Sequence, residues 1–121
     1  MRRVVTMMAL GALAATAGAT VAADSFRRLK GREITARFSG MEFTDDVHWA
    51  QVFARGGRLS TFAMGKASGG IWGVQNDELC WENGRGPRCH EVWISGTKVQ
   101  LRTPGIDIYD EGVLRKPKER R

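Results

Sequence analysis

The sequence predicts a mainly β protein, in which an antiparallel meander of about six or seven short strands curls into a partial or closed small barrel, with a short N-terminal helix. Between residues 47 and 102, short runs of alternating apolar and polar residues are separated by glycine-rich turns. Four tryptophans fall on four different predicted strands. A flat sheet would leave these rings and its long edges exposed, so curling is favoured. With 121 residues and 26% charged residues, we expect one folded domain.

The first 23 residues have the pattern of a secretory signal peptide. Arg2 and Arg3 precede an uncharged run, residues 4–23, which ends in Val-Ala-Ala before Asp24. A basic start, an apolar stretch and small residues before the cleavage point are typical of such signals. An uncleaved membrane anchor is the alternative, but a run rich in Ala, Gly and Thr inserts weakly. We expect cleavage after Ala23, a periplasmic or secreted protein, and a linker over residues 24–28.

The mature chain begins with a predicted helix and continues with six predicted strands. The helix is expected over residues 29–38, because Leu29, Ile34 and Phe38 are spaced as on one helix face and Gly40 follows at the expected end. The strands are expected over residues 47–54, 58–64, 70–75, 78–82, 88–94 and 97–102. These elements define a β-rich domain over residues 29–102.

Residues 103–121 are expected to form a basic, partly disordered tail. Ile106, Ile108 and Val113 could add one edge strand, but Pro117 and five basic residues follow Leu114. Removing residues 1–23 takes away two of the 19 basic residues and leaves 17 against 13 acidic ones. The excess of basic residues lies at the two ends of the mature chain, because residues 33–102 contain eight basic and eight acidic residues. This pattern disfavours nucleic-acid binding, which needs a basic face on the body. Weak contact of the tail with an anionic membrane surface is an alternative.

The only two cysteines are predicted to form a disulfide. Cys80 and Cys89 flank the turn-forming residues 83–87, which read NGRGP. If Gly84 and Arg85 form the hairpin tip, the two cysteines lie directly opposite each other, close enough to be bridged. Their spacing fits neither a redox motif nor haem attachment, and the ligands of a zinc site are missing. A disulfide also agrees with export to an oxidising compartment.

Candidate ligand-binding residues are the four tryptophans, because aromatic walls bind sugars and apolar small molecules. They are Trp49, Trp72, Trp81 and Trp93. The simpler interpretation, which we favour, is that they are the large core residues of a small domain.

No residue pattern predicts catalysis, a metal or a cofactor. The chain has two histidines, and His48 follows Asp45 and Asp46 closely enough to be considered as a metal ligand or as a base. The spacing matches no known ligand pattern, and no serine lies in a nucleophile-elbow motif. We therefore expect a non-enzymatic protein. A minimal hydrolase or metal-binding protein that uses His48 remains an alternative.

Several short motifs resemble small exported proteins of unknown function that are abundant in alphaproteobacteria. They are residues 29–34 (LKGREI), 38–40 (FSG), 56–59 (GGRL), 70–74 (GIWGV), 78–81 (ELCW), 89–93 (CHEVW) and 95–96 (SG). The resemblance implies a periplasmic β-rich domain with a disulfide that matches Cys80 and Cys89. It implies no catalytic or ligand-binding residues, and the basic tail departs from it.

The function expected from these observations is a non-enzymatic periplasmic binding or interaction module. Its partner would be another envelope protein or a small molecule bound at the barrel mouth. A small inhibitor of a secreted hydrolase is the alternative from another class. The positive charge disfavours inhibition of a cationic lysozyme, because complementary interfaces pair opposite charges.

Overall fold

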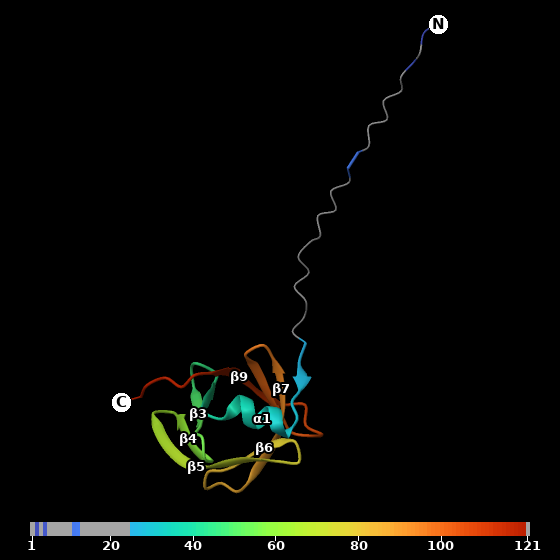
Figure 1. Ribbon diagram of the computed structural model, residues 1–121. Helices are drawn as coiled ribbons and strands as arrows, with labels where there is room; N and C mark the ends of the chain where they lie inside the picture. The colour runs from blue at the N-terminus through green and yellow to red at the C-terminus, as the bar shows by residue number, and fades with distance from the viewer. Residues whose placement is uncertain (1, 3, 5–10, 13–24, 121) are drawn as a thin grey trace.

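The protein forms a closed barrel of eight antiparallel strands, with one extra strand and one short helix (Figure 1). The computed structural model describes residues 2, 4, 11–12 and 25–120, so the predicted signal peptide lies almost entirely outside the described residues. The elements are β1 (Arg27–Arg28), α1 (Gly31–Phe38), β2 (Met41–Thr44), β3 (Trp49–Phe53), β4 (Arg58–Ala63), β5 (Lys66–Gln75), β6 (Glu78–Glu82), β7 (Arg88–Ser95), β8 (Lys98–Arg102) and β9 (Tyr109–Arg115). Strands β2 to β8 pair in chain order, and β9 closes the ring by pairing with both β8 and β2.

The six predicted strands correspond to β3–β8, except that β5 begins at Lys66, four residues before the predicted strand 70–75, and α1 lies within the predicted helix. The domain boundary at residue 102 was wrong, because β9 belongs to the barrel. Leu114 of β9 is 7% exposed and packs into the core. A Cβ on Gly112 would lie 2.5 Å from the carbonyl oxygen of Thr44, so only glycine lets β9 come this close to β2. Acidic and glycine residues interrupt the apolar positions of β9, so the sequence shows no clear alternation of apolar and polar residues there.

The expected linker, residues 24–28, also contains regular structure. Arg27 and Arg28 form β1 and pair with Ile94 and Trp93 of β7. Farther along β7, residues 88–90 pair with β6 on the strand edge that faces away from β8. Strand β1 thus anchors the start of the described domain to the barrel wall.

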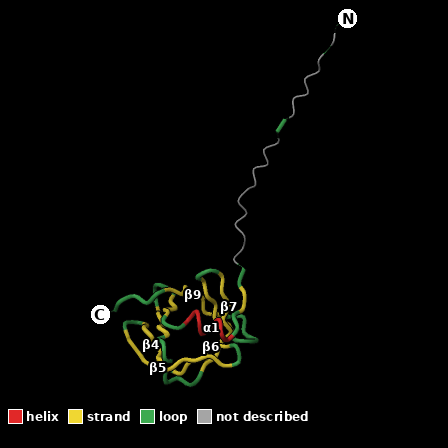
Figure 2. The backbone as a smooth tube through the Cα atoms, viewed as in Figure 1, coloured by secondary structure: helices red, strands yellow, loops and turns green. Residues whose placement is uncertain are grey.

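Helix α1 lies within the ring of strands (Figure 2). Ile34 and Phe38 are fully buried, and the Phe38 ring makes edge contacts with Phe43 and Phe53 at centroid distances of 6.4 and 5.1 Å. The helix also contacts β2, β5 and β6. The helix therefore supplies part of the core that the inward faces of the strands surround.

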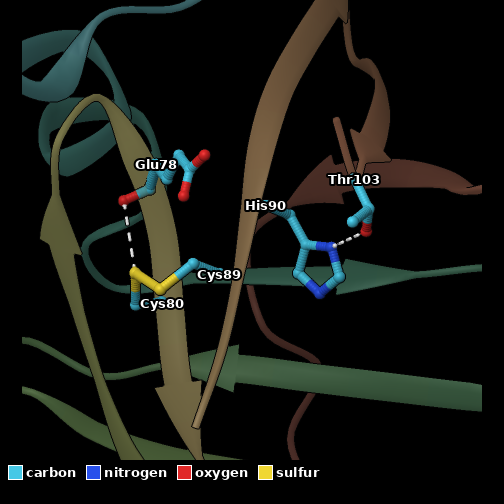
Figure 3. Close-up of a disulfide and its surroundings, with 5 residues drawn as sticks. All are labelled: Glu78, Cys80, Cys89, His90 and Thr103. Carbon is cyan, nitrogen blue, oxygen red and sulfur yellow. Dashed lines mark hydrogen bonds between the residues drawn. A yellow bond between two sulfur atoms is a disulfide. The ribbon is translucent and has the colours of Figure 1, made fainter. Parts of the chain in front are cut away.

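The predicted disulfide is confirmed. Cys80 on β6 and Cys89 on β7 are directly paired in the ladder, with 4.1 Å between their Cα atoms, and their sulfur atoms are bonded (Figure 3). Their neighbours Leu79 and Trp81 point into the core, so the bridge lies on the outer face of the barrel. In the loop-entropy model a loop this short stabilises the fold by about 2–3 kcal/mol.

The start of α1 is fixed by a residue from another part of the chain. The backbone N–H of Gly31 donates to Oδ1 of Asp77, which lies in the β5–β6 turn, at 2.7 Å. A carboxylate at this end satisfies an otherwise unpaired helix N–H and favours the helix dipole. A Cβ on Gly31 would lie 3.2 Å from the same oxygen, which explains a glycine inside the predicted helix.

We expect Asp77→Gly to lower the free energy of unfolding by about 1 kcal/mol, because it removes the acceptor for the Gly31 N–H. Glycine suits the positive φ of 58° at this position, so the loss would not come from backbone strain. Asp77→Asn keeps an acceptor oxygen and tolerates this φ, and we expect a smaller change. Urea unfolding measures both variants. Equal losses would mean that charge, rather than the hydrogen bond, makes the contribution.

Candidate functional site

A groove of about 670 Å³ lies on the barrel wall and is bordered by the last described residues of the chain. We call it the tail groove. Four residues that are successive cross-strand partners line it: Thr44 of β2, Ala50 of β3, Phe62 of β4 and Ala67 of β5. Arg115, Lys118 and Arg120 border one side, and the tip of the β4–β5 hairpin borders another. In Figure 1 the C-terminal segment runs toward this hairpin.

A buried carboxylate holds the C-terminal segment in place. Glu42 of β2 is fully buried and points away from the core, because its neighbours Met41 and Phe43 pack inward. It accepts a hydrogen bond from Nε of Arg115 at 3.1 Å and another from the Arg120 guanidinium. A buried charge is costly unless it is paired and hydrogen-bonded, so Glu42 requires these partners.

Arg120 also packs its guanidinium over the Phe62 ring, 4.4 Å from the ring centroid. This stacking is a favourable cation–π contact. The segment after β9 was expected to be a solvated tail, and the position of Arg120 differs from that expectation. The reason is that its partner Glu42 lies 78 residues earlier, where a charge count along the sequence cannot detect it.

Asp46 forms a second, more exposed ion-pair cluster at the same border. Its carboxylate lies 2.5 Å from Nη1 of Arg115 and 3.8 Å from Nζ of Lys118. The hydrogen bonds with Glu42 and Asp46 raise the pKa of Arg115, despite partial burial. With Lys66 on the hairpin, the groove has four basic side chains near two carboxylates. It therefore carries a net charge of about +2.

The turn between β2 and β3 depends on Asp45. One of its carboxylate oxygens accepts the backbone N–H groups of Val47, His48 and Trp49 at 3.0, 2.7 and 3.0 Å. Desolvation opposes ionisation, but these hydrogen bonds and one from His48 hold the pKa of Asp45 well below its usual range. The resulting stabilisation is present above the unfolded-state pKa and is lost as the pH falls through the lowered native value.

The structure brings together only part of the candidate site at His48. Nδ1 of His48 lies 2.8 Å from Oδ2 of Asp45, while Asp46 faces Arg115 instead. The imidazole is 78% exposed at the edge of the tail groove. Among the residues that the structure describes, no three His, Cys, Asp or Glu side chains are grouped to hold a metal ion. Asp45 has a structural role in the turn, and its contact with His48 is the only element of the proposed catalytic group that forms.

The four tryptophans do not line a common pocket. Trp49 lines the tail groove, and its ring lies against Phe43 at 4.8 Å. Trp72 donates from Nε1 to the carbonyl of Ala54 at 2.9 Å, and Trp81 is 8% exposed in the core. Trp93 points to the outer face, where the guanidinium of Arg102 lies 4.2 Å from its ring centroid. Of these candidates only Trp49 belongs to the groove.

His90, the second histidine, lies apart from the tail groove. Nδ1 shares a hydrogen bond of 3.1 Å with Oγ1 of Thr103, as Figure 3 shows. Burial lowers the pKa of His90, and its ring lies 4.8 Å from that of Trp81. The ring is therefore favoured in its neutral form beside the core.

Sequence reasoning did not single out the residues that shape the groove, namely Glu42, Phe62, Met64 and Arg120. One signal was available: Glu42 interrupts an apolar stretch, MEF, next to a glycine. In the described part of the chain, no helix has the length and apolar character needed to cross a membrane. No family model, curated protein or solved structure matches the chain.

We expect Arg120→Ala to lower the free energy of unfolding by about 1–3 kcal/mol, because Glu42 would stay buried with Arg115 as its remaining partner. Lys118→Ala is the matched control. Lys118 is 61% exposed, and its pair with Asp46 should contribute less than about 1 kcal/mol. Urea unfolding of both variants tests this. If the two changes were equally small, the tail would not be what satisfies Glu42.

Proposed function

We propose that the protein is a non-enzymatic binding module of the periplasm or the extracellular space, and that it binds its partner in the tail groove. The observation that carries this proposal is the pair of exposed apolar side chains beside the positively charged groove. Val47 in the β2–β3 turn is 79% exposed, and Met64 at the β4–β5 tip is 93% exposed. Exposed apolar groups that border a concave surface are typical of interaction sites.

The backbone at Met64 supports this interpretation. Its φ is 52°, a left-handed conformation that glycine or asparagine adopts more readily. For a methionine this backbone conformation is unfavourable, and it places a flexible apolar side chain at the tip of the hairpin. Such side chains adapt well to different partner surfaces. Unfavourable backbone geometry that presents a side chain to solvent suggests that this side chain has a function.

The partner is another envelope protein or a small molecule, and its contact surface combines apolar and acidic groups. Phe62 and Ala50 offer apolar contact, while Lys66 and Lys118 favour negative charge. A membrane surface is less suitable, because Glu42 already engages Arg115 and Arg120. Nucleic acid is also a poor candidate, since the groove combines few cations with two carboxylates.

Inhibition of a secreted hydrolase is a second candidate. The exposed tip of the β4–β5 hairpin is the feature that favours it, because an exposed turn can enter an enzyme cleft. The third candidate, a minimal hydrolase, rests on the contact between Asp45 and His48. In that case His48→Ala would abolish turnover of the bound molecule in a protein that is still folded.

Export can be tested separately from binding. We expect the protein recovered from the periplasm or medium to begin at Asp24, because the small residues before it fit signal peptidase. The intact mass of the purified protein shows at which residue the chain begins. A protein that still carries residues 1–23 would contradict the proposed localisation.

We expect a photo-crosslinking residue at position 64 to capture the partner in living cells, because Met64 extends beside the groove. The same residue at position 108 is the control, since Ile108 is 82% exposed between β8 and β9 and does not line the groove. Mass spectrometry detects adducts of protein or small-molecule size. Adducts at position 108 alone, or at neither position, would contradict binding in the tail groove. An adduct with a hydrolase that the protein inhibits would favour the second candidate.

A further inference from the structure

Half of strand β5 has no partner on one side. Strand β4 pairs with residues 66–71 of β5, whereas β6 pairs only with residues 71–75. We call residues 66–70 the free edge, since no other described strand pairs with it. The free edge begins where β6 ends: a Cβ on Gly70 would lie 2.3 Å from the carbonyl oxygen of Glu82.

The free edge lacks the features that usually block strand addition. Exposed edges in natural proteins carry several charges, a proline or a bulge, which prevent pairing with other chains. The free edge reads KASGG, with one charged residue at its start and small side chains after it. Residues 66–69 are exposed. Their backbone is thus accessible to an incoming strand.

The free edge is continuous with the tail groove. The cross-strand row that lines the groove ends at Ala67, which is on the free edge and directly opposite Phe62. Lys66 and Ala67 are neighbours in a strand, so their side chains point to opposite faces. A strand added here would place one side chain beside Ala67, in the same cross-strand row as Phe62, and the next beside Lys66.

We propose that the free edge binds an extended segment of a partner protein in which apolar and acidic residues alternate. This rests on the proposed function and specifies its ligand. The main chain of the segment pairs with residues 66–70. Its apolar side chains extend the row of Ala67 and Phe62, and its acidic side chains face Lys66. Main-chain pairing supplies affinity, and the alternating side chains supply specificity.

The probe is a capped nine-residue peptide of alternating valine and glutamate, added to the isotope-labelled mature protein. We expect NMR shift changes across residues 66–70 and slower hydrogen exchange at those alternate amides of this stretch that point away from β4. Lys66→Glu should weaken binding about tenfold, and Lys30→Glu, an exposed charge reversal before α1, should not. A valine–lysine peptide should bind more weakly than the probe. Peptides N-methylated at either set of alternate amides show which set pairs with β5, and one of the two should fail to bind.

Several results would overturn the inference. One is binding of both N-methylated peptides as tightly as the probe, because strand pairing requires these N–H groups. Another is protection of residues 66–70 that grows with protein concentration alone, which would identify a second copy of the chain as the occupant. A third is a crosslink at position 64 with no effect of the probe on β5. That result would keep the proposed function and reject strand addition.

Discussion

The seam between β2 and β9 is the contact on which the rest of the molecule depends. Glu42 and Arg115 are direct partners in the ladder across this seam, and Arg120 completes the neutralisation of the buried carboxylate. These three side chains link β2 to β9 and hold the end of the chain against β4, and the two arginines border the tail groove. A carboxylate buried at this place therefore links the closure of the fold to the shape of the candidate site.

The interior of the barrel imposes a second constraint, which the helix satisfies. The ring of strands leaves a space that α1 fills with Ile34 and Phe38. The helix has only eight residues, too few to be stable alone in water. Its first turn is held by Asp77 from the β5–β6 turn, and its position depends on contacts with three strands. Helix and barrel thus stabilise each other.

The parts of the fold that local patterns predict are those whose partners are close in sequence. Strands β3–β8 form a meander, so most alternating runs and turns could be recognised by themselves, although residues 66–69 of β5 lie outside the predicted strand. Counting from the hairpin tip paired Cys80 with Cys89. Strand β2 was missed because it is short, and β9 was expected only as a possible edge strand, since two acidic residues and a glycine interrupt its apolar positions. The tail groove was missed for a related reason: Glu42 and Arg120 are 78 residues apart, and no local period connects them. The tryptophans were a conspicuous but misleading signal for a shared pocket, since only Trp49 reaches the groove.

Because β2 forms near the start of the domain and its partner β9 near the end, the order of synthesis affects folding. In a chain that emerges from its N-terminus, helix α1 and strands β2–β8 become available before β9. Until β9 arrives, the outer edge of β2 stays open and the carboxylate of Glu42 has neither arginine partner. Pairings between such distant segments are slow to form, and unpaired strand edges expose intermediates to aggregation. A chain that stops before Arg115 would hold almost the whole meander and still lack its closing contact. The barrel can therefore close, with its buried carboxylate paired, only after its last strand and the two arginines at and beyond the end of that strand are present.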